Sequence, residues 1–349
     1  MFKKILLFVF LLSFGAAAAL VFQVKDELER PLGIDEETLY QVSSGASLRR
    51  VLTDFESRGW IGDARIHEVW LRFQEVTGIQ RGEYLLRPDE TTEMAIRRMI
   101  AGDKVMRSVQ LIEGWNFRQF RRAIAANEYI THSLTDLSDD EVIARLGLDI
   151  EHPEGWFFPD TYLFERGTTD VELLRQAHRQ LVAELELAWA QRSENLPFDT
   201  PYEALIMASI IERETGVPYE RPEIAGVFTR RLEQGMRLQT DPTVIYGMGD
   251  AYQGRITRTN LQTDTPYNTY TRHGLPPTPI ANPGRGALRA AVNPAEGTSL
   301  FFVARGDGSH IFSDTYAEHN AAVQQFQRNR SADYRSSPSE EVLNRERSE

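Results

Sequence analysis

The sequence has no cysteine among its 349 residues, and its seven histidines are scattered. The lack of cysteine excludes disulfides, thiolate metal sites and a cysteine nucleophile, although it does not separate an exported protein from a cytosolic one. Because no HExxH or similar ligand spacing occurs, we expect no metal and no other cofactor. Positive charge is scarce as well, since 39 Lys and Arg face 51 Asp and Glu, a net charge of −12. This balance argues against nucleic acid as a partner.

A long uncharged run, in contrast, is present near the N-terminus, from Ile5 to Phe22, directly after Lys3 and Lys4. A helix of that length spans about 27 Å, close to the hydrocarbon thickness of a bilayer. The lysines predict a cytoplasmic tip over residues 1–4, a transmembrane anchor over 5–22 and an external remainder. A cleaved signal peptide is the alternative, because Ala16 to Ala19 offers a cleavage site. The apolar residues that continue through Phe22 favour the retained anchor.

The next residues predict an acidic linker over 23–37 and a small module over 38–103. The module reads as a strand at 39–42, helices capped by Ser47 and Asp63, a strand at 82–86 and a helix at 91–101. This order of elements resembles a LysM module, a family that binds glycan strands of the cell wall. A purely structural spacer is the alternative.

Residues 104–199 predict an intermediate part with a strand at 107–112, helices at 116–126 and 139–147, and a long helix capped by Thr169. Its most distinctive segment is EGWFFPDTY, residues 154–162. Aromatic rings stack on the apolar faces of sugars, but such a cluster also suits a core.

A helix carrying an unusually placed acid is predicted from Thr200 to Gly216. Its start carries a capping box and a proline, and residues 204–211 are apolar except for one serine, as in a buried helix. Glu212 is the first charge after that run, and small side chains share its face, which leaves room for a ligand. Burial raises the pKa of a carboxyl group, so Glu212 suits a general acid. Alternatively it pairs with Arg213 or Arg230, and Glu214, roughly 200° round the helix, stays open as the acid.

Two irregular stretches follow, at residues 235–249 and 267–284, and we expect loops there with a short turn of helix. Their amides, hydroxyls and phenols suit a neutral polyol ligand, although a structural wrap around the core would also explain them. A hairpin at 300–312 and a helix at 316–328 complete a catalytic core over 200–330. His310 and His319 are either partners of the site or core histidines. The tail, 331–349, is predicted to be disordered. The fold class is therefore α+β: a transmembrane helix, a LysM-like α/β module and a mixed α+β catalytic domain.

Four segments together resemble one family over nearly the whole chain: ASIIERET, MRLQTDPTVIYGMG, YNTYTRHGLPPTPIANPG and EGWFFPDTY. They closely resemble the endolytic murein transglycosylases of the MltG (YceG-like) family. The resemblance implies a single-pass protein of the bacterial inner membrane whose external domain, a lyase, cleaves nascent peptidoglycan strands between N-acetylmuramic acid and N-acetylglucosamine. It implies 1,6-anhydro ends, termination of strand growth, and cell-wall synthases (penicillin-binding proteins) as neighbours. The family's catalytic glutamate maps onto Glu212.

The chemistry of such a lyase needs a single carboxyl group. It protonates the glycosidic oxygen and then accepts the proton of the sugar's own C6 hydroxyl as that oxygen attacks the anomeric carbon. We expect the loops to bind the sugars through Gln239, Thr240, Asp241, Tyr246, Tyr267, Asn268 and Tyr270. A lysozyme-like hydrolase would need a second carboxylate, for which Asp241 is the candidate. A non-catalytic cell-wall scaffold is the alternative from another class.

Overall fold

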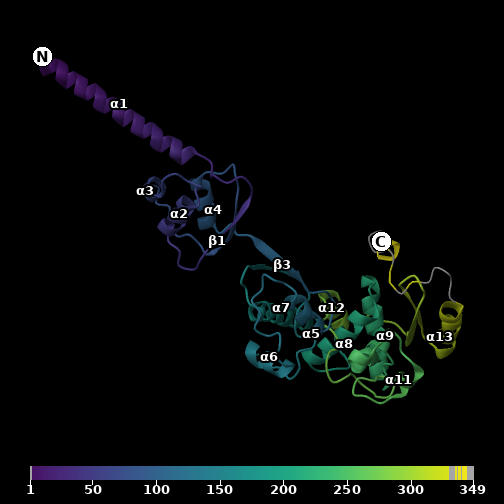
Figure 1. Cartoon of the computed structure of the whole chain (residues 1–349). Coiled ribbons are helices and arrows are strands. Elements are labelled where there is room, and N and C mark those ends of the chain that lie inside the picture. Colours follow the sequence, from purple (N-terminus) through teal and green to yellow (C-terminus); the bar gives the residue numbers. More distant parts are fainter. Residues whose placement is uncertain (1, 330–334, 336, 339, 344–349) are drawn as a thin grey trace. The chain divides into compact units, whose positions relative to one another are not determined.

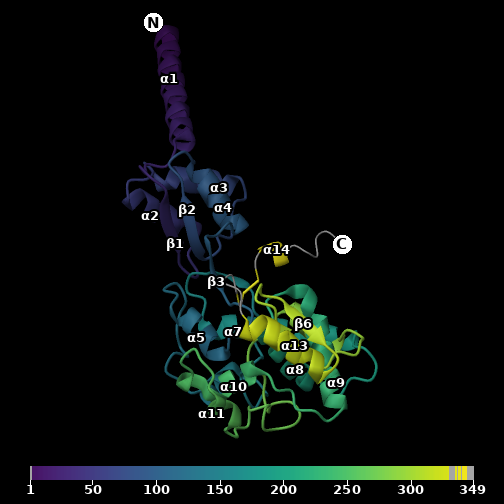
Figure 2. The same ribbon diagram turned by 90° about the vertical axis from the view of Figure 1, so that its right-hand side faces the viewer.

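The structure is a computed structural model that describes residues 2–329, 335, 337–338 and 340–343. Its elements divide between two compact units, which we describe separately (Figures 1 and 2). Unit 1 comprises Met1–Ser108 and Leu163–Gly167, and unit 2 comprises Val109–Tyr162 and Thr168–Glu349.

The N-terminal helix α1 is longer than the predicted anchor, because it runs from Phe2 to Glu29. It has the length and composition of a membrane-spanning helix, and no residue in it is buried. The predicted linker is therefore helical in its first half. Glu27, near the C-terminal end of α1, accepts hydrogen bonds from the backbone N–H groups of Gly62, at 2.5 Å, and Asp63, at 3.1 Å. These bonds fix the end of the helix to residues 62–63 and so hold the first half of the predicted linker in helical form.

Unit 1 otherwise follows the predicted order of strand, two helices, strand and helix. Its elements are β1 (Thr38–Val42), α2 (Leu48–Ser57), α3 (Ala64–Phe73), β2 (Gly82–Leu86) and α4 (Thr92–Ala101). Strands β1 and β2 pair antiparallel, with Tyr40 opposite Tyr84. The predicted caps Ser47 and Asp63 each accept a backbone hydrogen bond at the start of their helix. The order of elements is confirmed, whereas the LysM relationship remains a prediction.

Unit 2 is mainly helical. Its longer elements are α5 (Phe117–Ala125), α6 (Asp139–Leu146), α7 (Asp170–Ala190), α8 (Pro201–Glu214), α9 (Arg221–Glu233), α10 (Asp241–Met248), α11 (Arg258–Gln262), α12 (Arg285–Val292) and α13 (Tyr316–Val323). Short elements are η1 (Pro218–Glu220), η2 (Gly249–Ala251), η3 (Gln324–Arg328) and α14 (Glu340–Leu343). Strands β5 (Phe301–Ala304) and β6 (His310–Ser313) form the predicted antiparallel hairpin. Strands β3 (Met106–Gln110) and β4 (Thr161–Glu165) form a two-stranded sheet.

Helix α8 lies in the middle of the unit 2 core (Figure 1). Its residues from Ala204 to Ile211 are all buried, and it packs against α7, α9, α10 and α12. Burial on every side explains why its apolar residues show no single stripe. Helices α5, α6 and α7 of the predicted intermediate part belong to the same compact unit as α8.

Three regions differ from the sequence-based expectation. The stretch 235–249, expected to be mostly loop, contains the eight-residue helix α10, for which Pro242 supplies a rigid first turn. Helix α12 directly follows the irregular stretch and was not predicted; its alanines pack on α8. The predicted disordered tail lies largely outside the described residues, although α14 lies within it.

Candidate active site

The C-terminal end of α8 brings two acids out of the core. The predicted capping box is present, with Thr200 and Glu203 each bonding the other's backbone N–H. This box fixes the start of the helix, and the fully buried residues 204–211 fix its depth. Glu212 and Glu214 are thus the first carboxyl groups after the buried run, and they leave the helix on different sides.

Glu212 is held by an ion pair and a backbone group. Its Oε1 lies 3.1 Å from Nη2 of Arg221, and its Oε2 accepts a hydrogen bond from the N–H of Gly284 at 3.0 Å. The Glu212 side chain is 5% exposed and that of Arg221 is 12% exposed. Burial raises the pKa of Glu212 to about 7, although Arg221 and the Gly284 N–H favour its charged form. Both carboxylate oxygens are therefore engaged by the protein itself.

Polypeptide approaches Glu212 closely on the side of Arg221 and Gly284. A Cβ atom on Gly284 would lie 2.3 Å from Cδ of Glu113, and one on Gly286 would lie 2.3 Å from Nη1 of Arg221. Glycines at these positions let the backbone approach the Glu113 carboxylate and the Arg221 guanidinium closely. Glu212 lines none of the three cavities described below. The predicted pairing with Arg213 or Arg230 also differs, because the partner is Arg221.

Glu214 lies against an open cavity. Its Oε1 accepts a hydrogen bond from the Thr240 hydroxyl. It lines a cavity of about 430 Å³, which we call the Glu214 pocket, together with Gln239, Asp241, Tyr270, His310 and His319 among others. Burial raises the pKa of Glu214 to about 7, while the Thr240 hydroxyl opposes that rise. A carboxyl group in this state can hold a proton near neutral pH and release it to a ligand.

A cluster of threonines fixes the segment that faces Glu214. The N–H of Thr240 donates to Oγ1 of Thr269 at 3.1 Å, and the Thr243 hydroxyl donates to the carbonyl of Thr240 at 2.8 Å. The preceding residue, Gln239, adopts a left-handed backbone conformation with φ 54°, which is unfavourable for a residue with a Cβ. Such strain is held by surrounding bonds and gathers at functional sites. Here it directs Thr240 toward Glu214.

Of the seven predicted sugar-binding residues, Thr240 is bonded to Glu214, and the other six fall into three groups. Gln239, Asp241 and Tyr270 line the Glu214 pocket, where the Tyr270 hydroxyl donates to Oδ1 of Asp241 at 2.6 Å. Tyr246 and Tyr267 instead pack edge to face, with ring centroids 4.9 Å apart, on the wall of a second cavity.

Asn268 forms a group by itself. It is 1% exposed, and its Nδ2 donates to three backbone carbonyls of residues 260–263. Its Oδ1 accepts the N–H of Tyr270 at 2.9 Å. Asn268 therefore holds the loop that carries Tyr270, and its side chain has no free group to offer a sugar.

The two predicted histidines both line the Glu214 pocket. Nδ1 of His310 lies 2.9 Å from Oε2 of Glu220, which also accepts the Thr215 hydroxyl at 3.2 Å. His319 stacks on Phe301, with ring centroids 5.2 Å apart. Their positions favour the interpretation as partners of the site over that of core histidines.

The second cavity is lined by a buried acid that the sequence pattern did not single out. It has a volume of about 540 Å³, and Glu154, Tyr246, Tyr267, Arg213 and Pro242 are among its lining residues; we call it the Glu154 pocket. Glu154 is 3% exposed, accepts the N–H of Phe117 at 2.9 Å, and has its pKa raised to about 8 by burial. Its signal was its position at the start of the aromatic segment 154–162, of which Phe157, Phe158 and Tyr162 are core.

The hydrolase alternative predicted that Glu212 and Asp241 act together. The structure places Asp241 in the Glu214 pocket and Glu212 beside Arg221, and none of the three cavities described here is lined by both acids. A retaining or inverting hydrolase needs both carboxyl groups on the same bond.

Comparisons with known proteins agree with this architecture. The profile of the YceG-like family matches residues 40–325. The chain is 29% identical over 319 residues to a protein of Bacillus subtilis (strain 168) named endolytic murein transglycosylase, covering 86% of this chain and 88% of that protein. It is 24% identical to a protein of Streptococcus pneumoniae (strain ATCC BAA-255 / R6) with the same name, covering 81% of this chain and 57% of that protein.

A solved structure shows the same fold. The crystal structure of a YceG-like protein from Listeria monocytogenes matches with a TM-score of 0.52 and 29% sequence identity, over 82% of this chain and 99% of that one. Together with the profile match, which covers most of unit 2 and the β1 to α4 part of unit 1, this shows that the chain belongs to the YceG-like family.

Proposed function

We propose that this protein is a membrane-anchored lytic transglycosylase that cleaves murein strands internally, and that Glu214 is its proton donor. The names of the relatives support the reaction type. The observation that carries the choice of acid is the contrast at the end of α8. Glu214 faces a cavity beside neutral hydrogen-bonding groups, whereas both oxygens of Glu212 are taken up by Arg221 and Gly284.

The reaction follows from one carboxyl group that holds a proton. Glu214 protonates the glycosidic oxygen as the bond to the anomeric carbon breaks. The resulting carboxylate takes the proton of the C6 hydroxyl of N-acetylmuramic acid while that oxygen attacks the anomeric carbon. The products are a 1,6-anhydro end and a free hydroxyl on N-acetylglucosamine, and no water is consumed.

The Glu214 pocket offers neutral dipoles to the sugars beside the charged side chains of Asp241 and Arg231. Thr240 orients the carboxyl group, and Gln239 and Tyr270 offer an amide and a phenol to the sugars. Burial beside Asp241 holds the pKa of Tyr270 well above its usual range, so its hydroxyl stays a donor. Dipoles fixed in advance stabilise the developing charge without reorganisation. Glu212 then has a structural role, pairing with Arg221.

The location follows from α1. With Lys3 and Lys4 on the cytoplasmic side, α1 would anchor the chain in the inner membrane and leave both units outside the cytoplasm. The substrate would be nascent glycan strands, and penicillin-binding synthases the neighbouring proteins. Cleavage within a strand would end its elongation.

Mass spectrometry of the products tests the proposal. Purified murein strands are incubated with the full chain in detergent and with Glu214→Gln, whose side chain keeps the shape but holds no transferable proton. We expect anhydro ends from the parent chain and none from the variant. Reducing ends from the parent would show a hydrolase, and intact strands would show a non-catalytic scaffold.

A further inference from the structure

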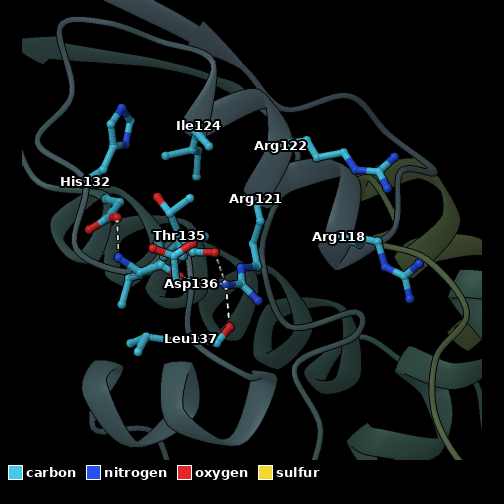
Figure 3. A pocket seen from close by; sticks show the side chains of 12 residues that line it. Arg118, Arg121, Arg122, Ile124, His132, Thr135, Asp136 and Leu137 are labelled. Atoms are coloured by element: carbon cyan, nitrogen blue, oxygen red, sulfur yellow. Dashed lines mark hydrogen bonds between the residues drawn. The ribbon is translucent and has the colours of Figure 1, made fainter.

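Helix α5 carries three arginines that differ in what they bind. Arg121 donates to the carbonyls of Leu134, at 2.6 Å, and Leu137, at 2.7 Å, and it pairs with Asp139 at 3.1 Å. Figure 3 shows it turned toward these groups, in a cavity of about 380 Å³, while Arg118 and Arg122 point together to another side. Arg118 and Arg122 are four residues apart and so share a helix face. Arg121 is thus a structural residue, and the other two face outward.

Arg118 and Arg122 also line the Glu154 pocket, whose wall includes Arg213. Three acids line the same pocket, but two of them are already paired, Asp139 with Arg121 and Asp250 with Arg118. The third, Glu154, is buried and accepts protein hydrogen bonds.

Two guanidinium groups in this pocket have no carboxylate partner in the part of the chain that the structure describes. The guanidinium of Arg122 has neither an ion pair nor a hydrogen bond there, and Nη1 of Arg213 donates to the carbonyl of Gly114 at 3.2 Å. An unmatched pair of guanidinium groups in a cavity is suited to a carboxylate or phosphate ligand. This local feature contrasts with the net charge of −12 on the chain.

Residues adjacent in the chain line the Glu154 pocket and the Glu214 pocket at two places. Arg213 and Pro242 line the former, and their chain neighbours Glu214 and Asp241 line the latter. Neighbouring Cα atoms are about 3.8 Å apart, so the walls of the two pockets come close at the end of α8 and the start of α10. An extended peptide spans about 3.3 Å per residue, so a short peptide on a sugar near Glu214 is long enough to cover that separation.

We propose that the Glu154 pocket binds a carboxylate of the peptides attached to murein strands, with Arg122 and Arg213 as its cationic ligands. This inference rests on the proposed function, because it concerns the same substrate. The peptides are joined to the lactyl group of N-acetylmuramic acid and carry free carboxylates, whereas the glycan backbone between them is neutral. Recognition of the peptides would restrict cleavage to strands that still carry them.

The test compares strands with peptides to the same strands after an amidase has removed the peptides and the lactyl carboxylates that it leaves have been converted to amides. The parent chain should cleave the peptide-bearing strands with the lower KM. Arg122→Gln should raise KM on these strands by about threefold to tenfold, as for the loss of a partly exposed ion pair, and leave kcat and the cleavage of peptide-free strands unchanged. Arg122→Lys, which keeps the charge, should recover part of the loss. Arg179→Gln, an exposed arginine on α7 outside both pockets, is the matched control.

Each outcome has one meaning. If the parent chain has the same KM on both kinds of strand, peptide recognition is overturned while the lyase proposal stands. The same holds if Arg122→Gln raises KM equally on both kinds of strand. An unchanged KM of Arg122→Gln on peptide-bearing strands overturns it too. If the parent chain cleaves neither kind of strand, the proposed function itself fails. High salt should reduce the preference of the parent chain for peptide-bearing strands, because it screens exposed charges.

Discussion

At its C-terminal end, α8 carries one glutamate on each of two sides, and the two glutamates have different surroundings. Burial raises the pKa of Glu212 and of Glu214 to about 7. On the Glu212 side, an arginine and a backbone N–H contact the two carboxylate oxygens, and glycines bring the loop close. On the Glu214 side, a hydroxyl donates to the carboxyl group and a cavity lies open. A raised pKa alone therefore does not identify the acid, because the opening beside it decides what it can protonate.

The largest effect should come from replacing the two acids separately. Glu214→Gln should lower kcat/KM by about 10²-fold to 10⁴-fold, the usual contribution of general acid catalysis. Glu212→Gln should retain most of the activity, since its amide still accepts the Gly284 N–H. The measurement is the rate of release of anhydro-ended fragments.

The reverse result would contradict our choice of acid. An inactive Glu212→Gln with an unchanged melting temperature, beside an active Glu214→Gln, would assign the proton donor to Glu212, as the sequence analysis expected. Circular dichroism of both variants serves as the control for folding.

The sequence predicted the elements of this site better than its geometry. The capping box of Thr200 and Glu203 and the apolar run 204–211 predicted α8 because both are local patterns. The choice between Glu212 and Glu214 depended instead on Gly284, Arg221 and Thr240, which lie 72, 9 and 26 residues away from the acids they contact. Helical phase gives the direction of a side chain but not what another segment places opposite it.

The polar loops show the same limit. Their hydroxyls and amides predicted sugar binding, yet Asn268 uses its side chain to hold backbone carbonyls. Glu154 was missed as an individual residue for a related reason. Its pocket is formed by α5, α10 and the loop at Tyr267, which are far apart in the sequence. Composition indicates which groups are present, but tertiary contacts decide which remain free.

The second largest effect should be on stability, on the Glu212 side. Arg221→Met would leave Glu212 without its cation in a site that is 5% exposed, and should cost about 2–4 kcal/mol, somewhat below the range for a fully buried pair because Glu212 can take up a proton. Thermal unfolding should show a clear fall in the melting temperature. The double variant Glu212→Gln, Arg221→Met should be more stable than Arg221→Met alone. A single variant as stable as the parent chain would show that the pair contributes nothing.

The pH dependence should be a smaller effect that separates the two sides. Cleavage by the parent chain should decline as the pH rises through about 7, because Glu214 loses the proton it must donate. Glu212→Gln should keep this profile. The measurement is kcat/KM between pH 5 and pH 9, and a decline that disappears in Glu212→Gln would contradict the assignment.

Stability should follow pH in the same direction. Both folded-state pKa values lie above the ordinary glutamate value of 4.5, so folding favours the protonated forms. Their stabilising contribution is complete below that ordinary value and is lost as the pH rises through about 7. Each Glu→Gln variant should therefore flatten this decline, whereas only Glu214→Gln should abolish cleavage.

The smallest effect should come from removing the Thr240 hydroxyl, which bonds Glu214. Thr240→Val removes the hydrogen bond to the Glu214 carboxyl while keeping the size of the side chain. Because that bond favours the charged carboxylate, its loss should raise the pKa of Glu214 and move the alkaline decline in kcat/KM upward by about half a unit. The same decline measured in Glu212→Gln should not move, since Glu212 has no bond to Thr240. If the decline shifts in Glu212→Gln as well as in Thr240→Val, the two carboxyl groups titrate together. The two sides of α8 would then differ only in the access that a ligand has to the carboxyl group.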